Sequence, residues 1–585
     1  MADSHPDPGT PARYLNRILP VPALAALVLL ILQYGFPLSG DAALYCFLAS
    51  EAILGLWIVQ EWLRLWWAAD RSAHLRQYPG RLMLTVPGLL YFVGHIFRTV
   101  SYESTPDHMV LRDLPLLWMA LIQTGLVLTH LIGIIRRRFR DRGIQPGKVF
   151  AGSFLLGSGI GAALLLLPRC TTAGIDPVDA LFVAVSAICV TGLSTVDVAT
   201  VFTPLGQGVI LILMQIGGLG IMTLTMAFVT LMPGSLSVRE KVMLQDMLSE
   251  DRLSSIGALL RRITAITVLV ELAGATVLYL QLHQGDGWDG ELAFRCLFHA
   301  VSAFCNAGFS NLPDASLAEV LARPGIGAVI MMLIVLGGIG FPVLVDLGGF
   351  LRHRLRGIRD YRSLHLSTRL VLISTLLLLL GGAAAILLTD RAGSFIGMTM
   401  AEQMYNSLFL AVSSRTAGFA AVPVGSLSHA TVLVVVILMW IGASPASCGG
   451  GIKTVTVALA FLNVRAVLRG EQEVEIFGRV IDRRSLARAF AGMTLSVAIL
   501  GLASLALFWL EPGPAPLDLA FEAVSAWSTT GLSRGITADL GKPAALLLVL
   551  LMLVGRVGAV TLATSLLRRA PEKHYGYLRE NIPVN

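Results

Sequence analysis

Residues 184–193 read AVSAICVTGL, and the same pattern returns three more times along the chain. The later copies read AVSAFCNAGF at 300–309, AVSSRTAGF at 411–419 and AVSAWSTTGL at 523–532. Their glycines follow one another at intervals of 116, 110 and 113 residues. Self-similarity at a nearly fixed period indicates a repeated structural unit. Four copies of one unit can close a ring, and a ring of four glycine-bearing loops can act as a cation filter.

The composition is that of an integral membrane protein. Of 585 residues, 55% are hydrophobic and only 14% are charged, and the mean hydropathy is +0.74. Soluble domains carry about 25% charged residues, so this chain falls outside their range. Apolar runs such as 371–388 and 545–567 reach the roughly 20 residues that a helix needs to cross a bilayer.

The loops alternate in the sign of their charge. Because basic loops are usually cytoplasmic, we expect a multi-pass protein of the cytoplasmic membrane with both termini in the cytoplasm. The intervening acidic loops would then raise the cation concentration at the outer mouth. The net charge of +7 does not indicate nucleic-acid binding, since the basic residues flank spans instead of forming one patch with aromatic residues. The basic loops lie near 71–81, 136–148, 239–262, 352–362 and 479–488.

Each of the four copies sits in the same order of apolar segments. A long span comes first, a stretch of some 12 apolar residues follows, and the glycine phrase and a second span complete the unit. The short stretches cannot cross the bilayer, so we expect them to enter from outside and stop as pore helices. Non-helical backbone at membrane depth is tolerated only where it lines water or is buried in protein. We therefore predict an all-α membrane protein with pore repeats at 146–250, 251–363, 364–480 and 481–585, the last with a C-terminal tail.

The first 145 residues hold four further apolar segments, near 18–37, 42–66, 83–99 and 114–135. We predict that 1–145 is an N-terminal four-helix membrane domain. Its fourth segment lacks the ladder of arginines that a voltage sensor needs, so we interpret the domain as a packing element.

The glycine phrases carry the chemistry expected of a cation filter. A dehydrated cation needs its lost water oxygens replaced, and backbone carbonyls do this without placing a full charge in the pore. Glycine adopts the required backbone conformations at little cost. Small-residue helix contacts are the alternative interpretation, but it does not account for four copies that each follow a short helix. The predicted filter residues are Val190, Thr191 and Gly192; Asn306, Ala307 and Gly308; Thr416, Ala417 and Gly418; and Thr529, Thr530 and Gly531.

The second span of the third repeat is interrupted at 441–454, which read IGASPASCGGGIKT. Proline and three consecutive glycines cannot continue an ordinary helix, so we expect a polar intramembrane loop just below the filter, placed to act as a gate. A phosphate-binding loop would need a preceding strand and a lysine directly after glycine, and Ile452 stands between them here. The predicted gate residues are Ser444, Pro445, Ser447, Gly449, Gly450, Gly451, Lys453 and Arg556.

Lys453 and Arg556 place positive charges in apolar spans. Such a charge costs a few kcal/mol unless it faces water or a partner. The sequence leaves two interpretations open: these cations pair with the free carbonyls of the broken loop and set a barrier at the pore, or they extend to the cytoplasmic surface.

These residues resemble the Trk/Ktr/HKT superfamily of potassium transporters, and most of all its KtrB-type membrane subunits. The resemblance covers about 146–585. It rests on the fourfold phrase, on the form RTAGF at 415–419, on GIKT at 451–454 and on GRVG at 555–558.

The resemblance implies a pseudo-fourfold pore in each subunit of a homodimer embedded in the lipid bilayer. It implies that the loop of the third repeat is the gate and that Arg556 is a second constriction. It also implies a cytosolic ring of RCK/KTN-type (KtrA/TrkA-like) subunits, which would bind the regulating nucleotide, and docking surfaces on the basic loops and on residues 580–585. In related plant transporters a serine at the first filter glycine goes with sodium permeation, so Gly192 favours potassium.

Three features depart from the family pattern. Cys189 stands where a threonine is more usual, which would alter the innermost ion site. Residues 1–145 have no counterpart in the most similar members, and the chain contains no RCK domain, so regulation would come from another chain.

We therefore expect the pore-forming subunit of a Ktr/Trk-type potassium uptake system, conducting passively, with coupling to sodium or protons left open. The alternatives are a sodium-permeable HKT-like transporter, a non-conducting membrane sensor and a membrane enzyme. An enzyme should show a pair of titratable groups within the membrane, and Glu271 and Asp346 stand in different spans. We expect no cofactor in this chain and no metal site besides the transported ion, because the six cysteines form no CxxC pair.

Overall fold

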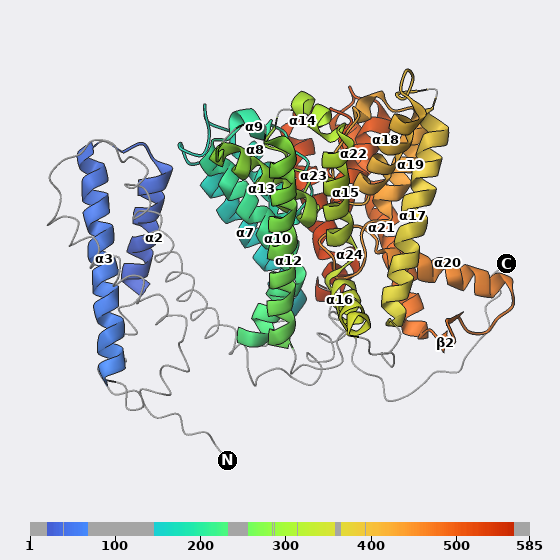
Figure 1. The fold of residues 1–585 in the computed structure, drawn as a ribbon, viewed down its shortest axis with the longest axis horizontal. Coiled ribbons are helices and arrows are strands. Elements are labelled where there is room, and N and C mark those ends of the chain that lie inside the picture. The colour runs from blue at the N-terminus through green and yellow to red at the C-terminus, as the bar shows by residue number, and fades with distance from the viewer. Residues whose placement is uncertain are drawn as a thin grey trace, which may run out of the picture.

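The computed structural model describes residues 20–38, 40–67, 146–231, 256–356 and 364–566, apart from single positions at 284, 286, 313 and 392. In these ranges the chain is almost entirely helical, and long helices run side by side through the body (Figure 1). We refer to the four predicted repeats as the first to fourth segments. The long helices that open them are α7 (Pro146–Leu165), α12 (Ile256–Leu282), α17 (Leu366–Asp390) and α21 (Arg483–Leu510).

Four shorter helices lie in the upper half of the body in Figure 1. They are α8 (Pro177–Cys189), α13 (Gly290–Cys305), α18 (Met400–Ser413) and α22 (Pro516–Ser528). Local chemistry fixes where they begin. Asp176 caps α8 by accepting a hydrogen bond from the Val178 amide, and Thr399 and Glu402 form a capping box at α18. Pro516 opens α22, where the missing amide proton costs nothing.

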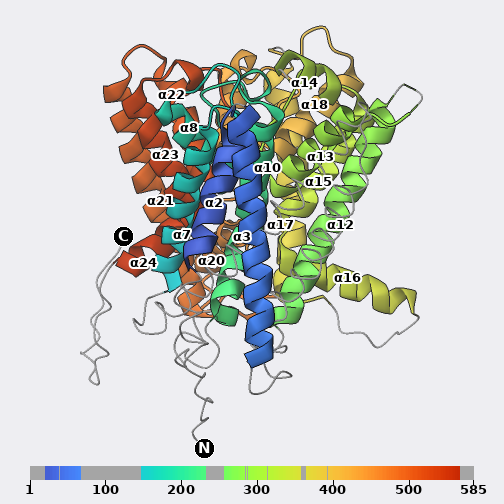
Figure 2. The same cartoon turned by 90° about the vertical axis from the view of Figure 1, so that its left-hand side faces the viewer.

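The helices that close the four segments are bent or broken, except for α10 (Pro204–Leu231). The sequence predicts second spans near 325–347 and 543–567, and the structure shows that neither stretch is a single straight helix. A bend of 103° separates α15 (Pro324–Gly338) from α16 (Phe341–Leu355), and Gly558, at φ +86°, separates α23 (Lys542–Val557) from α24 (Ala559–Leu566). The expected interruption near 441–454 is present, between α19 (His429–Trp440) and α20 (Thr454–Leu468). In Figures 1 and 2, α16, α20 and α24 lie at the lower end of the body.

The remaining elements are short. A two-stranded antiparallel hairpin, which the all-α prediction did not include, pairs Glu475 with Val480. It is made of β1 (Glu475–Ile476) and β2 (Arg479–Val480). The short helices are α9 (Val198–Val201), α14 (Asp314–Leu321), η2 (Val424–Ser426) and η3 (Thr537–Asp539).

Two N-terminal helices, α2 (Pro20–Gly35) and α3 (Gly40–Trp67), pack against each other. The carbonyl oxygen of Gly35 accepts a hydrogen bond from the Arg169 amide at 3.1 Å, which joins this pair to the loop after α7. These helices agree with the first two predicted N-terminal segments. The other two, 83–99 and 114–135, lie outside the described residues, as do 232–255 and 567–585.

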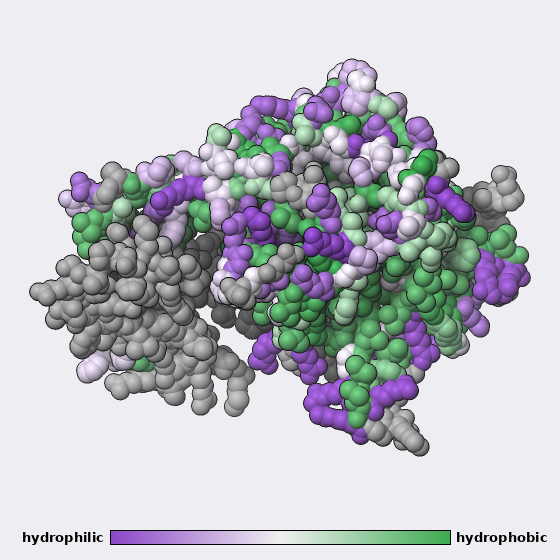
Figure 3. All heavy atoms as spheres, turned by 45° about the horizontal axis from the view of Figure 1, so that its top comes forward, coloured by the Kyte–Doolittle hydropathy of each residue, from purple (hydrophilic) through white to green (hydrophobic). Residues whose placement is uncertain are grey.

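The outside of the body is apolar, which is the surface that lipid requires. Leu269, Leu377 and Leu502, on three different long helices, are 69%, 67% and 70% exposed. Figure 3 shows hydrophobic residues spread over the flank of the body, with hydrophilic ones over its upper part and again along its lower edge. Within the described residues, α12 (from Arg261), α17 and α21 are each long and apolar enough to cross a membrane, and the bent pair α15–α16 adds a fourth if it is one span.

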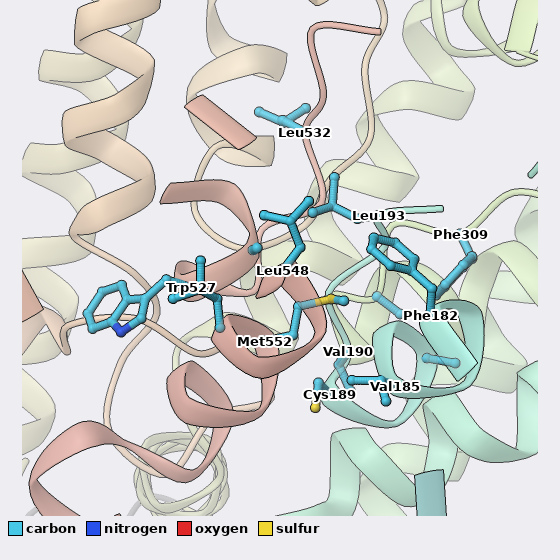
Figure 4. Close-up of a cluster of buried hydrophobic side chains, with 14 of the residues drawn as sticks. Phe182, Val185, Cys189, Val190, Leu193, Phe309, Trp527, Leu532, Leu548 and Met552 are labelled. Carbon is cyan, nitrogen blue, oxygen red and sulfur yellow. The ribbon is translucent and has the colours of Figure 1, made fainter. Parts of the chain in front are cut away.

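The core lies between the short helices and the helices that follow them. Phe182 of α8 and Trp527 of α22 belong to one buried cluster with Leu548 and Met552 of α23 (Figure 4). Because α8 packs on both α10 and α23, the first and last segments meet in this cluster. The packing therefore closes the body around the ends of the four short helices.

Candidate functional site

The four glycine loops meet one another in cyclic order. A Cβ atom built on Gly308 would lie 2.7 Å from the carbonyl oxygen of Ala417, and one on Gly418 would lie 2.6 Å from that of Thr530. The Cβ of Gly192 would strike the carbonyl oxygen of Ala307, and that of Gly531 would strike the carbonyl oxygen of Thr191. Each glycine thus lies against the next loop, and the fourth loop returns to the first. No side chain fits at these positions without moving a neighbouring carbonyl.

The backbone of the loops explains the choice of glycine. Gly192, Gly308, Gly418 and Gly531 have φ of +93°, +69°, +77° and +88°, which L-residues rarely adopt. Two positions earlier in each loop a second residue is also left-handed: Val190, Asn306, Thr416 and Thr529 have φ of 58°, 59°, 70° and 52°. In each loop two residues with positive φ therefore flank the residue whose carbonyl lies against a ring glycine of a neighbouring loop. All twelve predicted filter residues therefore lie in the four loops that the fold brings together.

The loops begin at the C-terminal ends of the short helices. A helix carries a partial negative charge at its C-terminus, where the last carbonyls are unpaired. Four such ends converge beneath the ring of glycines, so the site favours a cation.

Sequence reasoning missed one set of side chains, the serine of each AVS phrase. Ser186, Ser302, Ser413 and Ser525 are each 0% exposed. The hydroxyls of Ser186 and Ser525 accept hydrogen bonds from the amides of Gly192 and Gly531, at 3.0 and 3.1 Å. The other two hydroxyls donate to the carbonyls of Phe309 and Phe419. The repetition of AVS itself was the available signal.

Sequence reasoning also missed His299 and Glu522, which stand one residue before the AVS phrase of the second and the fourth loop, respectively. Nε2 of His299 lies 3.0 Å from the Ser310 hydroxyl, and Oε1 of Glu522 accepts a 2.6 Å hydrogen bond from the Ser533 hydroxyl. Both serines stand two residues after a ring glycine. Glu522 also accepts from the Thr537 hydroxyl at 2.8 Å, so a fully buried carboxylate fixes the fourth loop above the ring.

Glycines in α10, α15 and α23, the helices that follow three of the glycine loops, allow these helices to approach the short helices closely. A Cβ on Gly217, Gly337 or Gly555 would strike the carbonyl oxygen of Ile188, Phe304 or Trp527, respectively. Each of these carbonyls belongs to the residue four positions before a ring glycine. The same contact therefore recurs in the first, second and fourth segments.

In the third segment the interrupted stretch takes this place, directly beneath the ring. The Gly450 amide donates a 3.0 Å hydrogen bond to the Thr529 hydroxyl, and Gly449 lies against Thr416. A β-bridge between Ile441 and Ile452 brings the two ends of the stretch together. The predicted gate residues 444–451 thus form a closed loop that touches two of the four filter loops. We refer to residues 441–453 as the glycine-rich loop.

The glycine-rich loop is also fastened to its neighbours. The amides of Ser444 and Cys448 donate to the carbonyls of Gly338 and Gly337, at 3.0 and 3.3 Å, and the Phe341 amide donates to the carbonyl of Ala446 at 3.1 Å. Pro445 lies against Gly340. The Ser447 hydroxyl donates to the Ser444 carbonyl at 2.6 Å within the loop. The bend between α15 and α16 is therefore formed against this loop.

The two cations of the predicted gate bind carbonyls. Nζ of Lys453 donates to the carbonyls of Gly449 and Gly450, at 2.7 and 3.3 Å. The guanidinium of Arg556 donates to the carbonyls of Cys448 and Gly217. Of the two interpretations left open by the sequence, the geometry favours pairing with loop carbonyls over extension to the surface. Gly451, at φ +67°, completes the set of gate positions within the loop.

The acidic and sulfur groups that remain do not assemble a reactive centre among the described residues. Glu271 is buried beside the Cys305 thiol, whereas Asp346 bonds to His365, so the two carboxyls form no pair. Cys189 is buried at the end of α8 (Figure 4). In the part of the chain that the structure describes, no cluster of three metal-ligating side chains occurs and the cysteines are free.

Comparison with known proteins identifies the family. Residues 155–575 match the family described as TrkH, cation transport protein. The chain belongs to this family. The resemblance to Trk/Ktr proteins predicted from the motifs is confirmed, and the family is one of transport proteins, not of enzymes. As a member with long apolar helices, the protein is embedded in a membrane.

Two relatives and one solved structure are similar to this TrkH-family chain. It is 36% identical to Ktr system potassium uptake protein B of Bacillus subtilis over 422 residues, 72% of this chain and 92% of that protein. It is 34% identical to the potassium/sodium uptake protein NtpJ of Enterococcus hirae over 458 residues, 77% of this chain and 99% of that protein. The crystal structure of the potassium transporter TrkH from Vibrio parahaemolyticus shares the fold, with a TM-score of 0.59, 16% identity and coverage of 83% of this chain and 97% of that one.

Proposed function

We propose that this TrkH-family chain is the pore-forming subunit of a potassium uptake system, and that the ring of four glycine loops is its selectivity filter. One observation carries the proposal. Every ring glycine lies against the carbonyl that precedes the glycine of the next loop, in the order first, second, third, fourth and first again. Four carbonyls brought together in this way, of Thr191, Ala307, Ala417 and Thr530, can replace the hydration shell of a cation.

The proposal includes a fourfold architecture. The short helices stand as pore helices, and residues 146–250, 251–363, 364–480 and 481–585 form four repeats around one axis. The recurrence of the close glycine contacts of Gly217, Gly337 and Gly555 supports equivalent positions in three of them. The glycine-rich loop takes the equivalent place in the third.

The glycine-rich loop is proposed as the gate. It lies under two filter loops, and Lys453 and Arg556 bond to its carbonyls. In this position the loop and the two cations oppose the passage of another cation. Opening would require these hydrogen bonds to break, and the binding of a partner subunit can supply the free energy for this.

The partners follow from the relatives. Three relatives are described by their names as proteins of a Ktr system, so we propose that this chain also works within a system of subunits. A homodimer with a cytosolic RCK/KTN-type ring, a cytoplasmic membrane location and cytoplasmic termini complete the proposal. The basic last turn of α16, with Arg352 and Arg354 at the end opposite the glycine ring, supports this orientation.

A sodium-permeable transporter is the second candidate. A relative named as a potassium/sodium uptake protein is 34% identical to this chain, so the family includes proteins named for both ions. Glycine at all four ring positions favours potassium. Cys189, at the end of the first short helix, is the residue we would examine first if sodium also passed.

The test is rubidium uptake into proteoliposomes that hold the purified full-length chain, with potassium or sodium as competitor. Block by potassium but not by sodium is the expected result. Equal block by both ions would replace the potassium proposal with the sodium-permeable one. Absence of uptake, both from the chain alone and from the chain co-purified with its cytosolic partners, would favour a non-conducting sensor.

A further inference from the structure

The serines of the AVS phrases hold the filter loops in two different ways. In the first and fourth loops, which read Thr-Gly-Leu, the hydroxyl accepts a hydrogen bond from the glycine amide. In the second and third loops, which read Ala-Gly-Phe, the hydroxyl donates to the carbonyl of the phenylalanine after the glycine. The bonding mode therefore follows the sequence of the loop.

The difference has a geometric consequence for the peptide that precedes each ring glycine. In a trans peptide the C=O of one residue and the N–H of the next point in opposite directions. When Ser186 holds the Gly192 amide, the carbonyl of Thr191 must point away from the helix α8. This carbonyl lies against Gly531 of the neighbouring loop, as expected. The Ser525 bond to Gly531 directs the carbonyl of Thr530 toward Gly418 in the same way.

In the other two loops the carbonyls of Ala307 and Ala417 also lie against a ring glycine, but the serine hydroxyl binds the carbonyl of the residue after the glycine. The Ser302 hydroxyl donates to the Phe309 carbonyl at 2.7 Å, which turns that oxygen back toward α13. Ser413 does the same to the Phe419 carbonyl beside α18. The run of oxygens available to an ion in these two loops then ends at the ring itself.

We infer that Ser186 and Ser525 are positioning residues that aim filter carbonyls, and that Ser302 and Ser413 are positioning residues that keep a further carbonyl out of the ion path. The first and fourth loops are neighbours in the ring, and so are the second and third. In one half of the filter the serines therefore hold the glycine amides, and in the other half they hold the phenylalanine carbonyls. This inference rests on the proposed function, since it assigns the oxygens of the same filter.

The two modes predict different losses. Without the Ser186 hydroxyl, the peptide between Thr191 and Gly192 can rotate and present an N–H to the ion, which lowers both potassium uptake and selectivity. Without the Ser413 hydroxyl, the Phe419 carbonyl is free to bind an ion, which lowers selectivity while uptake continues. We expect selectivity for potassium over sodium to change about tenfold in each case, which is about 1.4 kcal/mol.

The experiment compares Ser186→Ala, Ser413→Ala and a matched control, Ser407→Ala, in the purified full-length chain. Ser407 is also buried in α18, but its hydroxyl donates to the Gln403 carbonyl of its own helix at 2.6 Å. Rubidium uptake with potassium or sodium as competitor measures rate and selectivity. The unfolding temperature in potassium against that in sodium measures ion binding without flux. Ser186→Thr, which restores a hydroxyl, should recover selectivity.

The expected result is reduced uptake and selectivity for Ser186→Ala, reduced selectivity alone for Ser413→Ala, and wild-type selectivity for Ser407→Ala. If the first two variants keep the wild-type selectivity and lose only unfolding temperature, as the control does, the serines merely pack and the inference is wrong. If the wild type carries no rubidium, either alone or co-purified with its cytosolic partners, the proposed function fails. In that case the potassium–sodium difference in unfolding temperature decides the inference, and the same difference in all variants overturns it.

Discussion

The guanidinium group of Arg556 donates a hydrogen bond to the carbonyl oxygen of Cys448, so the end of α23 is fastened to the glycine-rich loop. Its second hydrogen bond, to Gly217, extends the contact to α10. One side chain therefore joins the first, third and fourth segments at a point just below the ring.

Replacing Arg556 by glutamine should raise ion flux. A hydrogen bond from a charged group contributes about 1.5–3 kcal/mol, so losing even one of the two should raise the open fraction by roughly tenfold or more. Rubidium uptake by the chain without partners is the measurement. Arg465→Gln, which removes an exposed arginine from the last turn of α20, is the control and should leave flux unchanged. Unchanged flux in Arg556→Gln would count against its role in the gate.

Deleting residues 446–450 should have a larger effect of the same sign. The deletion removes the carbonyls that bind Arg556 and Lys453 and the amide that binds Thr529. Flux should rise and should depend less on cytosolic partners. Lys453→Gln, which removes only the two lysine hydrogen bonds, should give an intermediate rise. A deletion variant that folds and conducts like the wild type would refute the gate.

Gly192→Ser should weaken the selectivity for potassium over sodium. The new Cβ would strike the Ala307 carbonyl oxygen. The backbone at position 192 has a φ of +93°, which strains any L-residue. Competition by sodium for rubidium uptake measures the effect. Gly174→Ser is a matched control, because Gly174 has φ +85° but nothing within 4 Å of its Cβ position. Equal selectivity in the two variants would remove Gly192 from the filter.

An ion pair at the upper end of the body predicts a pH dependence. Nζ of Lys542 lies 2.8 Å from Oδ2 of Asp176, and this hydrogen bond, with one from the Val178 amide, lowers the pKa of the Asp176 carboxyl. A lowered carboxyl pKa stabilises the folded state above the usual aspartate range, and the contribution is lost as pH falls through the lowered value. Both groups are exposed, so the effect is small.

Lys542→Gln should therefore lower the unfolding temperature slightly at neutral pH and not at acid pH. Lys542→Arg should behave as the wild type at both. The unfolding temperature of the purified chain, measured across the acid range, is the readout. A difference between wild type and Lys542→Gln that stays constant down to low pH would show that the pair does not cause it.

The short helices were predictable because their beginnings depend on neighbouring residues alone. Of the short apolar stretches predicted before the glycine phrases, the first and the last are observed as Pro177–Cys189 and Pro516–Ser528, and both helices begin at a proline. The interruption after Trp440 was predictable for the same reason, since proline and a run of glycines are local signals.

The bend between α15 and α16 had a local signal that the prediction of a span over 325–347 did not use, since Gly337, Gly338 and Gly340 stand shortly before Pro342. The contact that holds the bend was not visible in the sequence. Gly340 has φ +96° because the next amide, that of Phe341, bonds to the Ala446 carbonyl of another segment. The partners of Arg556 were hidden likewise, since Gly217 lies 339 residues away in sequence. Contacts of this kind are decided by packing, which no window of sequence contains.

The third loop is one residue shorter than the others: five positions separate Ser413 from Gly418, against six from Ser186 to Gly192. A ring assembled from four identical chains could not carry such a difference at one corner, because every substitution would appear four times. Here all corners belong to one polypeptide, so a single codon alters one quarter of the ring. If the ring is the filter proposed above, natural variation can therefore adjust ion preference in small, separate increments.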